Sequence, residues 1–217
     1  MKKYSCIIFD MDGTLTQTNQ LIYDSFNHIA AKYLNKTLTN SEIHALFGPP
    51  EQGAVENMIG KEHIIEAMDD YYRFYQNEHS TLAKIYPGTI DVLKYLHSHG
   101  IRIALFTGKG RRTTDITLEQ FGISAYFDMT ITGDDVEKFK PSGDGIRKIL
   151  QQFSLVPDKV LMVGDAVADF KASRETGVDI ASVLWDSYGK DDVINLSPDY
   201  LFHDVQTFFD WLKRIYA

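Results

Sequence analysis

Cys6-Ile7-Ile8-Phe9-Asp10-Met11-Asp12-Gly13-Thr14 opens with four apolar residues, which predict a buried β-strand, and continues with two aspartates two positions apart. Ionised side chains are rarely buried without partners, so a carboxylate pair at the end of a strand indicates a metal site or a covalent reaction. A second apolar run at residues 160–164 is followed by Asp165 and Asp169. Because open α/β sheets bind ligands at the carboxyl ends of their strands, we expect the two carboxylate pairs to meet there.

Short apolar runs alternate with longer amphipathic stretches along most of the chain, which is typical of βα units and a mainly parallel sheet. We expect strands at residues 4–9, 101–106, 128–132, 160–164, 180–184 and 200–202, and helices at residues 88–99, 111–121, 142–153, 167–176 and 204–216. Gly100, Gly122 and Gly177 stand where three of these helices should end. The predicted fold class is therefore α/β.

One segment, residues 16–84, breaks this alternation. It shows helical periodicity and no convincing strand, and the turn-like Tyr86-Pro87-Gly88 follows it. We expect residues 1–15 and 85–217 to form the core, and residues 16–84 to form a helical insertion that stands over the strand ends. The core of this small bundle, rather than a ligand platform, is the expected place of four aromatic residues: Tyr71, Tyr72, Phe74 and Tyr75.

Composition narrows the class of protein. The 217 residues can form one large domain or a core with a smaller insertion, and the formal net charge of −8 argues against a general nucleic-acid binder. Cys6 is the single cysteine, which excludes an intrachain disulfide and a thiolate metal cluster. The first strand leaves no room for a signal peptide, and no apolar run approaches the roughly 18 residues of a membrane span. We expect a cytoplasmic monomer or homodimer without a membrane or nucleic-acid partner.

The first carboxylate pair suits phosphoryl chemistry. Asp10 is the better candidate nucleophile, because a carboxylate can attack phosphorus to form an aspartyl-phosphate and divide a difficult hydrolysis into two steps. Asp12 can donate a proton to the leaving oxygen and later activate water. Gly13 and Thr14 indicate that the chain leaves the strand at this point, and we expect exposed backbone N–H groups to face the phosphate.

Positive charge is needed to hold a phosphate dianion among carboxylates. Mg²⁺ is the natural choice, because it prefers oxygen ligands and binds through one or two carboxylates plus substrate phosphate. Asp165 is the best second ligand after Asp10, with Asp169 one helical turn further on. Taken alone, Asp165 and Asp169 also fit acids that interact with a helix dipole.

Two further segments offer phosphate contacts. Thr107 supplies a hydroxyl at the end of a predicted strand, and Gly108 after it lets the backbone approach a phosphate closely. Lys140 supplies the remaining cation, with Lys138 a rival for the same role. Pro141 is expected to begin a helix, which would hold Lys140 near the helix N-terminus. Each residue alone has an ordinary structural interpretation, whereas their joint order along the chain indicates a site.

Four segments of the chain together resemble the haloacid dehalogenase superfamily of phosphotransferases. They are Asp10-Met11-Asp12-Gly13-Thr14-Leu15, Thr107, Lys140-Pro141 and Gly164-Asp165-Ala166-Val167-Ala168-Asp169. The helical insertion between the first two segments is similar to the cap of the phosphoglycolate phosphatase and β-phosphoglucomutase branch. The resemblance runs from residue 4 to residue 184, and it implies a Rossmann-like, doubly wound, mainly parallel core with a mobile cap over the site.

The resemblance also implies roles for single residues. Asp10 would be the nucleophile and Asp12 the general acid and base, while Thr107 and Lys140 would contact the phosphate. The implied Mg²⁺ site consists of Asp10, the backbone carbonyl of Asp12, Asp165 and, as a ligand or a supporting group, Asp169.

A cap loop is the third consequence of the resemblance. Gly48-Pro49-Pro50-Glu51 is similar to the substrate-facing loop of these phosphatases, in which an apolar residue usually stands at the position of Glu51. That carboxylate disfavours a highly anionic substrate unless Lys109 or Arg111 offsets it, and both of these residues also fit a solvated helix start. The candidate substrate-binding residues are Gly48, Pro49, Glu51, Gly108 and Lys109.

The leading hypothesis is a Mg²⁺-dependent phosphatase that acts on a small phosphorylated metabolite, a phosphate monoester. The same machinery could hydrolyse inorganic pyrophosphate, or transfer the phosphoryl group to a sugar as a phosphomutase. Dehalogenation is disfavoured, because it needs neither Asp12 as an acid nor the second carboxylate pair. A non-catalytic phosphate-binding module should have lost at least one of these groups, and all are present.

Overall fold

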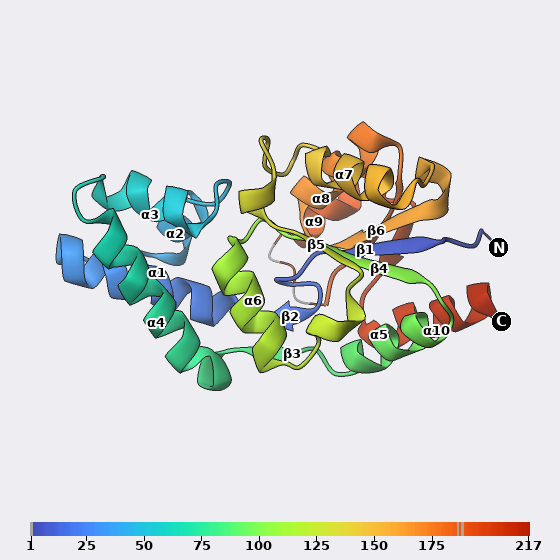
Figure 1. The fold of residues 1–217 in the computed structure, drawn as a ribbon, viewed down its shortest axis with the longest axis horizontal. Helices are drawn as coiled ribbons and strands as arrows, with labels where there is room; N and C mark the ends of the chain where they lie inside the picture. The colour runs from blue at the N-terminus through green and yellow to red at the C-terminus, as the bar shows by residue number, and fades with distance from the viewer. Residues whose placement is uncertain (1, 186, 188) are drawn as a thin grey trace.

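The computed structural model describes residues 2–185, 187 and 189–217, and its centre is a parallel sheet with the strand order β5-β4-β1-β6-β7-β8 (Figure 1). Residues 1, 186 and 188, which belong to the predicted core ranges, lie outside the described residues. The strands are β1 (Cys6–Phe9), β4 (Arg102–Phe106), β5 (Met129–Ile131), β6 (Val160–Gly164), β7 (Asp179–Val183) and β8 (Tyr200–Phe202). The predicted α/β fold with a parallel sheet is confirmed, and each strand lies within two residues of its expected position.

Strand β1 is central and fixes where the site forms. Its residue Phe9 pairs in register with Leu105 on one side and with Val163 on the other, so three strands end side by side. Residues that follow these strands, Asp10, Thr107 and Asp165 among them, therefore converge at one edge of the sheet.

Helices cover both faces of the sheet because the buried strands are apolar on both sides. Ile7 and Phe9 of β1 pack on one face with helices α5 (Thr89–Ser98) and α10 (Val205–Tyr216). Cys6 and Ile8 pack on the opposite face with α7 (Asp144–Phe153) and α8 (Val167–Thr176), so the sheet is doubly wound. Figure 1 shows these pairs of helices below and above the sheet.

Four helices, α1 (Asn19–Leu34), α2 (Asn40–His44), α3 (Glu51–Ile59) and α4 (Ile64–Leu82), form a separate layer that we name the helical segment. It lies at the end of the molecule away from both chain termini (Figure 1). Its apolar core includes Phe26 and Ile29, and Ile116 and Phe121 from α6 (Arg111–Gln120) and its C-terminal end pack against it. Of the four aromatic residues expected in this core, Tyr71 and Tyr75 are buried there and Tyr72 packs against it partly buried, whereas Phe74 is half-buried and stacks on His28.

The expectation of no strand in residues 16–84 is wrong at both ends of this range. Strand β2 (Thr16–Gln17) and strand β3 (Lys84–Ile85) pair antiparallel where the chain enters and leaves the helical segment. Two residues have no periodicity of their own, so such a pair carries no local sequence signal.

Other elements complete the chain. Helix α6 (Arg111–Gln120) follows β4 as expected, whereas the short helix α9 (Lys190–Asn195) is not predicted. Gly177 ends α8 in the left-handed conformation, and Gly100 and Gly122 adopt positive φ just after α5 and α6. Three 3₁₀ helices lie at Ser124–Tyr126, Gly133–Asp135 and Pro157–Lys159.

The expected helix start at Pro141 is wrong. Helix α7 begins at Asp144, and Pro141 lies before it, joined to Lys140 through a cis peptide bond. Lys140 therefore reaches the site from a loop rather than from the first turn of a helix.

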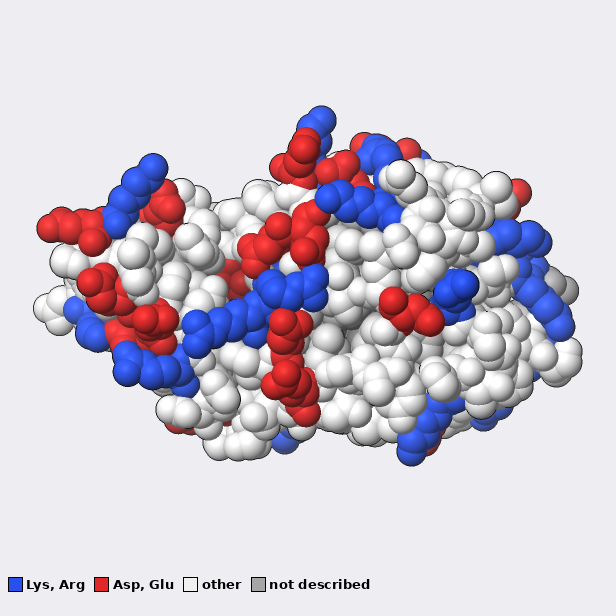
Figure 2. All heavy atoms as spheres, in the orientation of Figure 1, with Lys and Arg blue, Asp and Glu red and all other residues white. Residues whose placement is uncertain are grey.

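Within the described part of the chain, no helix has the length and apolarity needed to cross a membrane. The face in Figure 2 carries acidic and basic side chains side by side, most densely where the helical segment meets the sheet domain, by which we mean the parallel sheet and the helices that flank it. This face thus presents a mixed rather than a single-signed field.

Candidate active site

One cavity of about 340 Å³ lies between the carboxyl edge of the sheet and the helical segment. All the predicted site residues line it: Asp10, Asp12, Thr107, Gly108, Lys109, Lys140, Asp165 and Asp169 from the sheet side, and Gly48, Pro49 and Glu51 from the helical segment. The structure therefore brings together every side chain that the sequence assigns to the site.

The loop after β1 turns tightly and consumes its own backbone donors. The Gly13 N–H donates to the Thr16 carbonyl at 2.9 Å, and the Thr14 N–H donates to the Met11 carbonyl at 3.2 Å. These two N–H groups are therefore engaged within the loop, and the expectation that exposed N–H groups of this segment face a phosphate stays a prediction. The loop also delivers the side chains of the aspartates, and the Thr14 hydroxyl donates to Asp165 at 3.4 Å.

Two glycines make room for the carboxylates. Gly13 has a φ of +78°, and a Cβ there would stand 2.4 Å from Asp165 Oδ2. A Cβ on Gly164, the last residue of β6, would stand 2.4 Å from Asp169 Cγ. Any side chain at either position would displace a carboxylate of the site, so the close approach requires glycine.

Asp10, Asp165 and Asp169 form a buried cluster in which one oxygen from each residue lies within 4.8 Å of the others. Burial, together with the charges of Asp169 and Asp12, raises the pKa of Asp10 to about 7 against the opposing effect of Lys140. Burial and the charges of Asp10 and Asp169 hold the pKa of Asp165 well above its usual range. Crowded carboxylates of this kind fit a divalent cation with a preference for oxygen ligands.

Lys140 lies inside this cluster. Its Nζ is 2.8 Å from Asp10 Oδ1 and 2.6 Å from Asp169 Oδ1, and it stands 4.7 Å from the centre of the Phe106 ring. Although burial lowers it, these ion pairs raise the pKa of Lys140 above its ordinary value. The rival candidate, Lys138, is exposed.

Asp169 is held from two sides. Its Oδ1 meets Lys140, and its Oδ2 accepts from the Ala166 N–H at 3.1 Å at the start of α8. A carboxylate fixed in this way can orient the lysine ammonium as well as contribute charge to a cation site.

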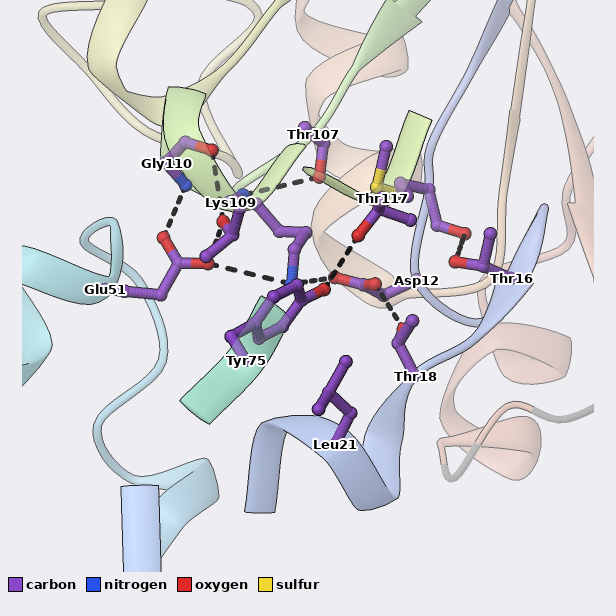
Figure 3. Close-up of polar contacts among 12 residues, drawn as sticks. Asp12, Thr16, Thr18, Leu21, Glu51, Tyr75, Thr107, Lys109, Gly110 and Thr117 are labelled. Atoms are coloured by element: carbon purple, nitrogen blue, oxygen red, sulfur yellow. Dashed lines mark hydrogen bonds and ion pairs between the residues drawn. The ribbon is translucent and has the colours of Figure 1, made fainter. Parts of the chain in front are cut away.

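Asp12 lies near Thr18 and near Tyr75 of the helical segment (Figure 3). The Thr18 hydroxyl donates to its Oδ1, and Lys109 Nζ stands 3.3 Å from its Oδ2. The two carboxylates of the Asp10/Asp12 pair therefore have different cationic partners, Lys140 and Lys109.

Lys109 is only 6% exposed, so the alternative of a solvated helix start is wrong for this residue. Its Nζ is 3.6 Å from Glu51 Oε1 and 4.8 Å from the centre of the Tyr75 ring. Burial lowers the pKa of Lys109, but Asp12, Tyr75 and Glu51 outweigh burial and raise it well above its ordinary value. Arg111, by contrast, remains partly exposed and pairs with Asp135.

Thr107 and the apolar wall complete the cavity. The buried Thr107 hydroxyl accepts from the Lys109 N–H at 3.3 Å, which fixes it at the end of β4. Ile22 and Phe26 from α1 and Phe47 from the loop before α3 line the opposite side. Thr18 and this apolar wall were not predicted as parts of the site, because the helical spacing of Ile22 and Phe26 does not distinguish a cavity wall from a core.

Known proteins resemble this chain in sequence and in fold. A family model described as haloacid dehalogenase-like hydrolase matches residues 7–183. The pyrophosphatase PpaX of Anoxybacillus flavithermus is 34% identical over 199 residues, which cover 92% of each chain. A structure described as a predicted phosphoglycolate phosphatase from Haemophilus somnus 129PT aligns over 99% of each chain with a TM-score of 0.84 and 21% identity. A haloacid dehalogenase-like family hydrolase from Streptococcus pneumoniae aligns over 98% of this chain and 100% of its own, with a TM-score of 0.78 and 25% identity.

The family model spans most of the chain, and the relative with 34% identity covers nearly all of it. The carboxylates and the lysine that carry the resemblance all line one cavity. This protein therefore belongs to the haloacid dehalogenase-like hydrolases.

Proposed function

We propose that this protein is a Mg²⁺-dependent phosphatase that hydrolyses a small phosphate monoester through an aspartyl-phosphate. The observation that carries the proposal is the convergence of Asp10, Asp12, Lys140 and Asp165 on one cavity at the carboxyl edge of the sheet. A nucleophilic carboxylate, a second carboxylate and a buried cation are the groups that such a reaction needs.

In the first step, an Asp10 oxygen attacks phosphorus while the bond from phosphorus to the leaving oxygen breaks, and Asp12 gives its proton to that oxygen. In the second step, Asp12 takes a proton from water as the water oxygen attacks the aspartyl-phosphate, which releases phosphate and restores Asp10. Thr18 and Lys109 hold the Asp12 carboxylate in place for both transfers.

Lys140 and Thr107 would contact the phosphoryl oxygens, the first as a cation and the second through its hydroxyl. Asp10, Asp165, the Asp12 carbonyl and, as a ligand or a supporting group, Asp169 would hold Mg²⁺. When bound, the ion would neutralise charge on the phosphoryl group and keep Asp10 ionised at neutral pH.

We propose that residues 16–84 act as a cap over the core formed by residues 1–15 and 85–217. Gly48, Pro49 and Glu51 would face the leaving group from this side, and Gly108 and Lys109 from the core. The cap would exclude bulk water from the phosphoenzyme. We further propose that the protein is a cytoplasmic monomer or homodimer and that its substrate is a small phosphorylated metabolite.

Pyrophosphate is the second candidate substrate. The relative from Anoxybacillus flavithermus, 34% identical over 92% of both chains, is described as a pyrophosphatase. The same carboxylates could cleave a phosphoanhydride, since phosphate would then be the leaving group. A sugar phosphomutase would need the cap to exclude water in favour of a bound sugar hydroxyl.

The test is phosphate release from a panel of phosphate monoesters and pyrophosphate, with Mg²⁺ and with excess chelator. We expect metal-dependent release, and the ratio of kcat/KM values separates monoester from pyrophosphate as substrate. A hexose monophosphate converted to its isomer without phosphate release would identify a mutase instead. No turnover of any compound by folded protein would contradict the proposal.

A further inference from the structure

Glu51, the first residue of α3, connects the helical segment to the sheet domain through a buried carboxylate (Figure 3). Its Oε2 accepts from the Gly110 N–H at 2.5 Å, and its Oε1 accepts from the Thr113 hydroxyl at 2.6 Å. The side chain is only 7% exposed although both donors belong to the start of α6, on the sheet domain. The Glu51 carboxylate thus joins the helical segment to the sheet domain, and both of its oxygens accept hydrogen bonds from the start of α6.

Lys109, next to Gly110, is the cation that this carboxylate faces. Its Nζ has ion pairs at 3.3 Å to Asp12 and 3.6 Å to Glu51, yet it is a buried atom without a hydrogen-bond partner in the described part of the chain. An ammonium group can donate three hydrogen bonds. Lys109 lines the cavity, so an anion bound there could compete with Glu51 for its ammonium group.

The charges around the cavity show why this competition matters. Its described lining contains five carboxylates, and its cations are Lys109 and Lys140. Lys140 is already bound between Asp10 and Asp169 at the phosphoryl position. A second anionic group on the substrate would therefore need Lys109, whose charge is already compensated by Asp12 at 3.3 Å and by Glu51 at 3.6 Å.

The remaining described wall has no cation to offer. On the side of the helical segment the cavity is bounded by the apolar Ile22, Phe26 and Phe47 and by Asn19, whose amide is polar but uncharged. An uncharged leaving group fits this wall, whereas a second phosphate would lose hydration there without gaining a cationic partner.

We propose that Glu51 determines the charge of the substrate: by occupying Lys109 it selects compounds with one phosphate group and an uncharged leaving group, and rejects those with a second phosphate. The selection rests on the proposed phosphatase function, because it concerns the leaving-group side of the same cavity. Glu51 acts through Lys109, and is therefore a specificity-determining residue rather than a participant in the proton transfers.

The test compares Glu51→Gln with Glu56→Gln. Glutamine keeps the size of the side chain and an oxygen that can accept from Gly110, but removes the charge that faces Lys109. Glu56 lies on the same helix and pairs with Lys61 at 3.5 Å, so its replacement removes one charge from α3 without touching the cavity. The probes are pyrophosphate and p-nitrophenyl phosphate, each with saturating Mg²⁺.

For Glu51→Gln we expect KM for pyrophosphate to fall by about tenfold or more, and KM for p-nitrophenyl phosphate to change by less than about threefold. Glu56→Gln should shift neither ratio. Adding Lys109→Met to Glu51→Gln should abolish the lower KM for pyrophosphate, since Lys109 is the group that loses its Glu51 partner and binds the second phosphate. A merely structural role for Glu51 would change both substrates equally, and that result would overturn the proposal.

Binding separates this inference from the proposed function. Calorimetric titration of pyrophosphate and of inorganic phosphate into an Asp10→Asn background, with and without Glu51→Gln, needs no turnover. A selective gain for pyrophosphate supports the role of Glu51 even if the panel yields no substrate. Equal binding in the two backgrounds contradicts it even if the protein is an active phosphatase.

Discussion

Lys140 illustrates how one side chain can organise several carboxylates. Its ammonium bridges Asp10 and Asp169, and the ring of Phe106 covers it from below. Asp169 is in turn fixed by the Ala166 N–H. Asp10, the proposed nucleophile, is thus oriented by a lysine whose own position is set by another carboxylate, Asp169.

Replacing Lys140 should therefore destabilise the protein as well as inactivate it. Lys140→Met leaves two buried carboxylates without their cation, and we expect a loss of about 3 kcal/mol in the free energy of unfolding at neutral pH. The loss should shrink below pH 7, because Asp10, whose pKa burial raises to about 7, then becomes protonated and needs no partner. Denaturant unfolding at several pH values measures it. Lys138→Met, an exposed neighbour, is the control, and equal losses in the two variants would contradict the ion-pair interpretation.

Asp10→Asn should separate chemistry from folding. We expect kcat to fall by at least about 10³-fold, because the amide cannot form the aspartyl-phosphate. The variant should be at least as resistant to heat as the parent, since the raised pKa of Asp10 reports crowding that the amide relieves. Phosphate release and thermal unfolding of the same preparation test both statements. Activity close to that of the parent would remove Asp10 from its role as nucleophile.

At the scale of elements, the contact between α4 and α6 includes buried polar groups. Tyr75 on α4 exchanges a hydrogen bond of 2.8 Å with Thr117 on α6. His79 Nε2, on α4 beside Phe121 at the end of α6, is buried and without a hydrogen-bond partner in the described part of the chain. Water would satisfy this atom if the helices separated, so the contact is less costly to open than an apolar one of equal area.

His79 should make this interface sensitive to acid. Burial, helped by the charge of Lys109, lowers the pKa of His79 to about 4. The folded state holds this histidine neutral while the unfolded chain binds a proton near pH 6.5, so stability is full above pH 6.5 and declines as the pH falls toward 4. The decline should reach about 3 kcal/mol.

The check is the difference in unfolding free energy between the parent and His79→Phe, followed from pH 7 to pH 4. The phenylalanine can pack against Tyr75 and Phe121, the ring neighbours of His79. The variant should lose this part of the acid sensitivity, whereas His203→Phe, at an exposed site, should keep it. Parallel pH curves for the parent and His79→Phe would exclude His79 as the cause.

At the scale of the whole molecule, most charged side chains of the cavity follow the strands of the sheet, and the helical segment bounds the cavity on the opposite side. In the cluster of Asp10, Asp165 and Asp169, the first two residues follow the adjacent strands β1 and β6, and Asp169 lies in the first turn of α8. A cation that binds this cluster adds its binding free energy to the stability of the entire fold.

Mg²⁺ should therefore raise the Tm of the protein. At about 100-fold excess over its Kd, a ligand that binds only the folded state contributes about 2.7 kcal/mol, which corresponds to a shift of about 5–10 °C for a chain of this size. Calorimetric scans with MgCl₂ and with NaCl of equal ionic strength measure the effect. Asp165→Asn should remove it, and an equal shift in that variant would place the cation elsewhere.

Much of the sheet and the site was predictable because the relevant signals are local. The apolar run before Asp10 and the run before Asp165 each define a strand and its end, and parallel pairing then brings the ends together. The burial of Lys109 was not predictable in this way. Its neighbours in sequence, Gly108 and Gly110, suggest an exposed loop, and only the packing of α3 and α4 against α6 encloses it.

The pairing of β2 with β3 was hidden for a related reason. Thr16 meets Ile85 and Gln17 meets Lys84, although these residues are far apart along the chain. No periodicity within two residues announces such a contact, which depends on where the intervening helices place the returning chain.

This small pair has a consequence for how the protein can change. Because β2 and β3 are hydrogen-bonded neighbours, the residues between them form an insertion that leaves and re-enters the sheet domain at adjacent points. An insertion of different length or shape, joined at the same β2–β3 pair, would leave the carboxylates after β1 and β6 in place. The proposed determinants of substrate choice, in the inserted helices, and those of phosphoryl chemistry, after the strands of the sheet, can then evolve separately.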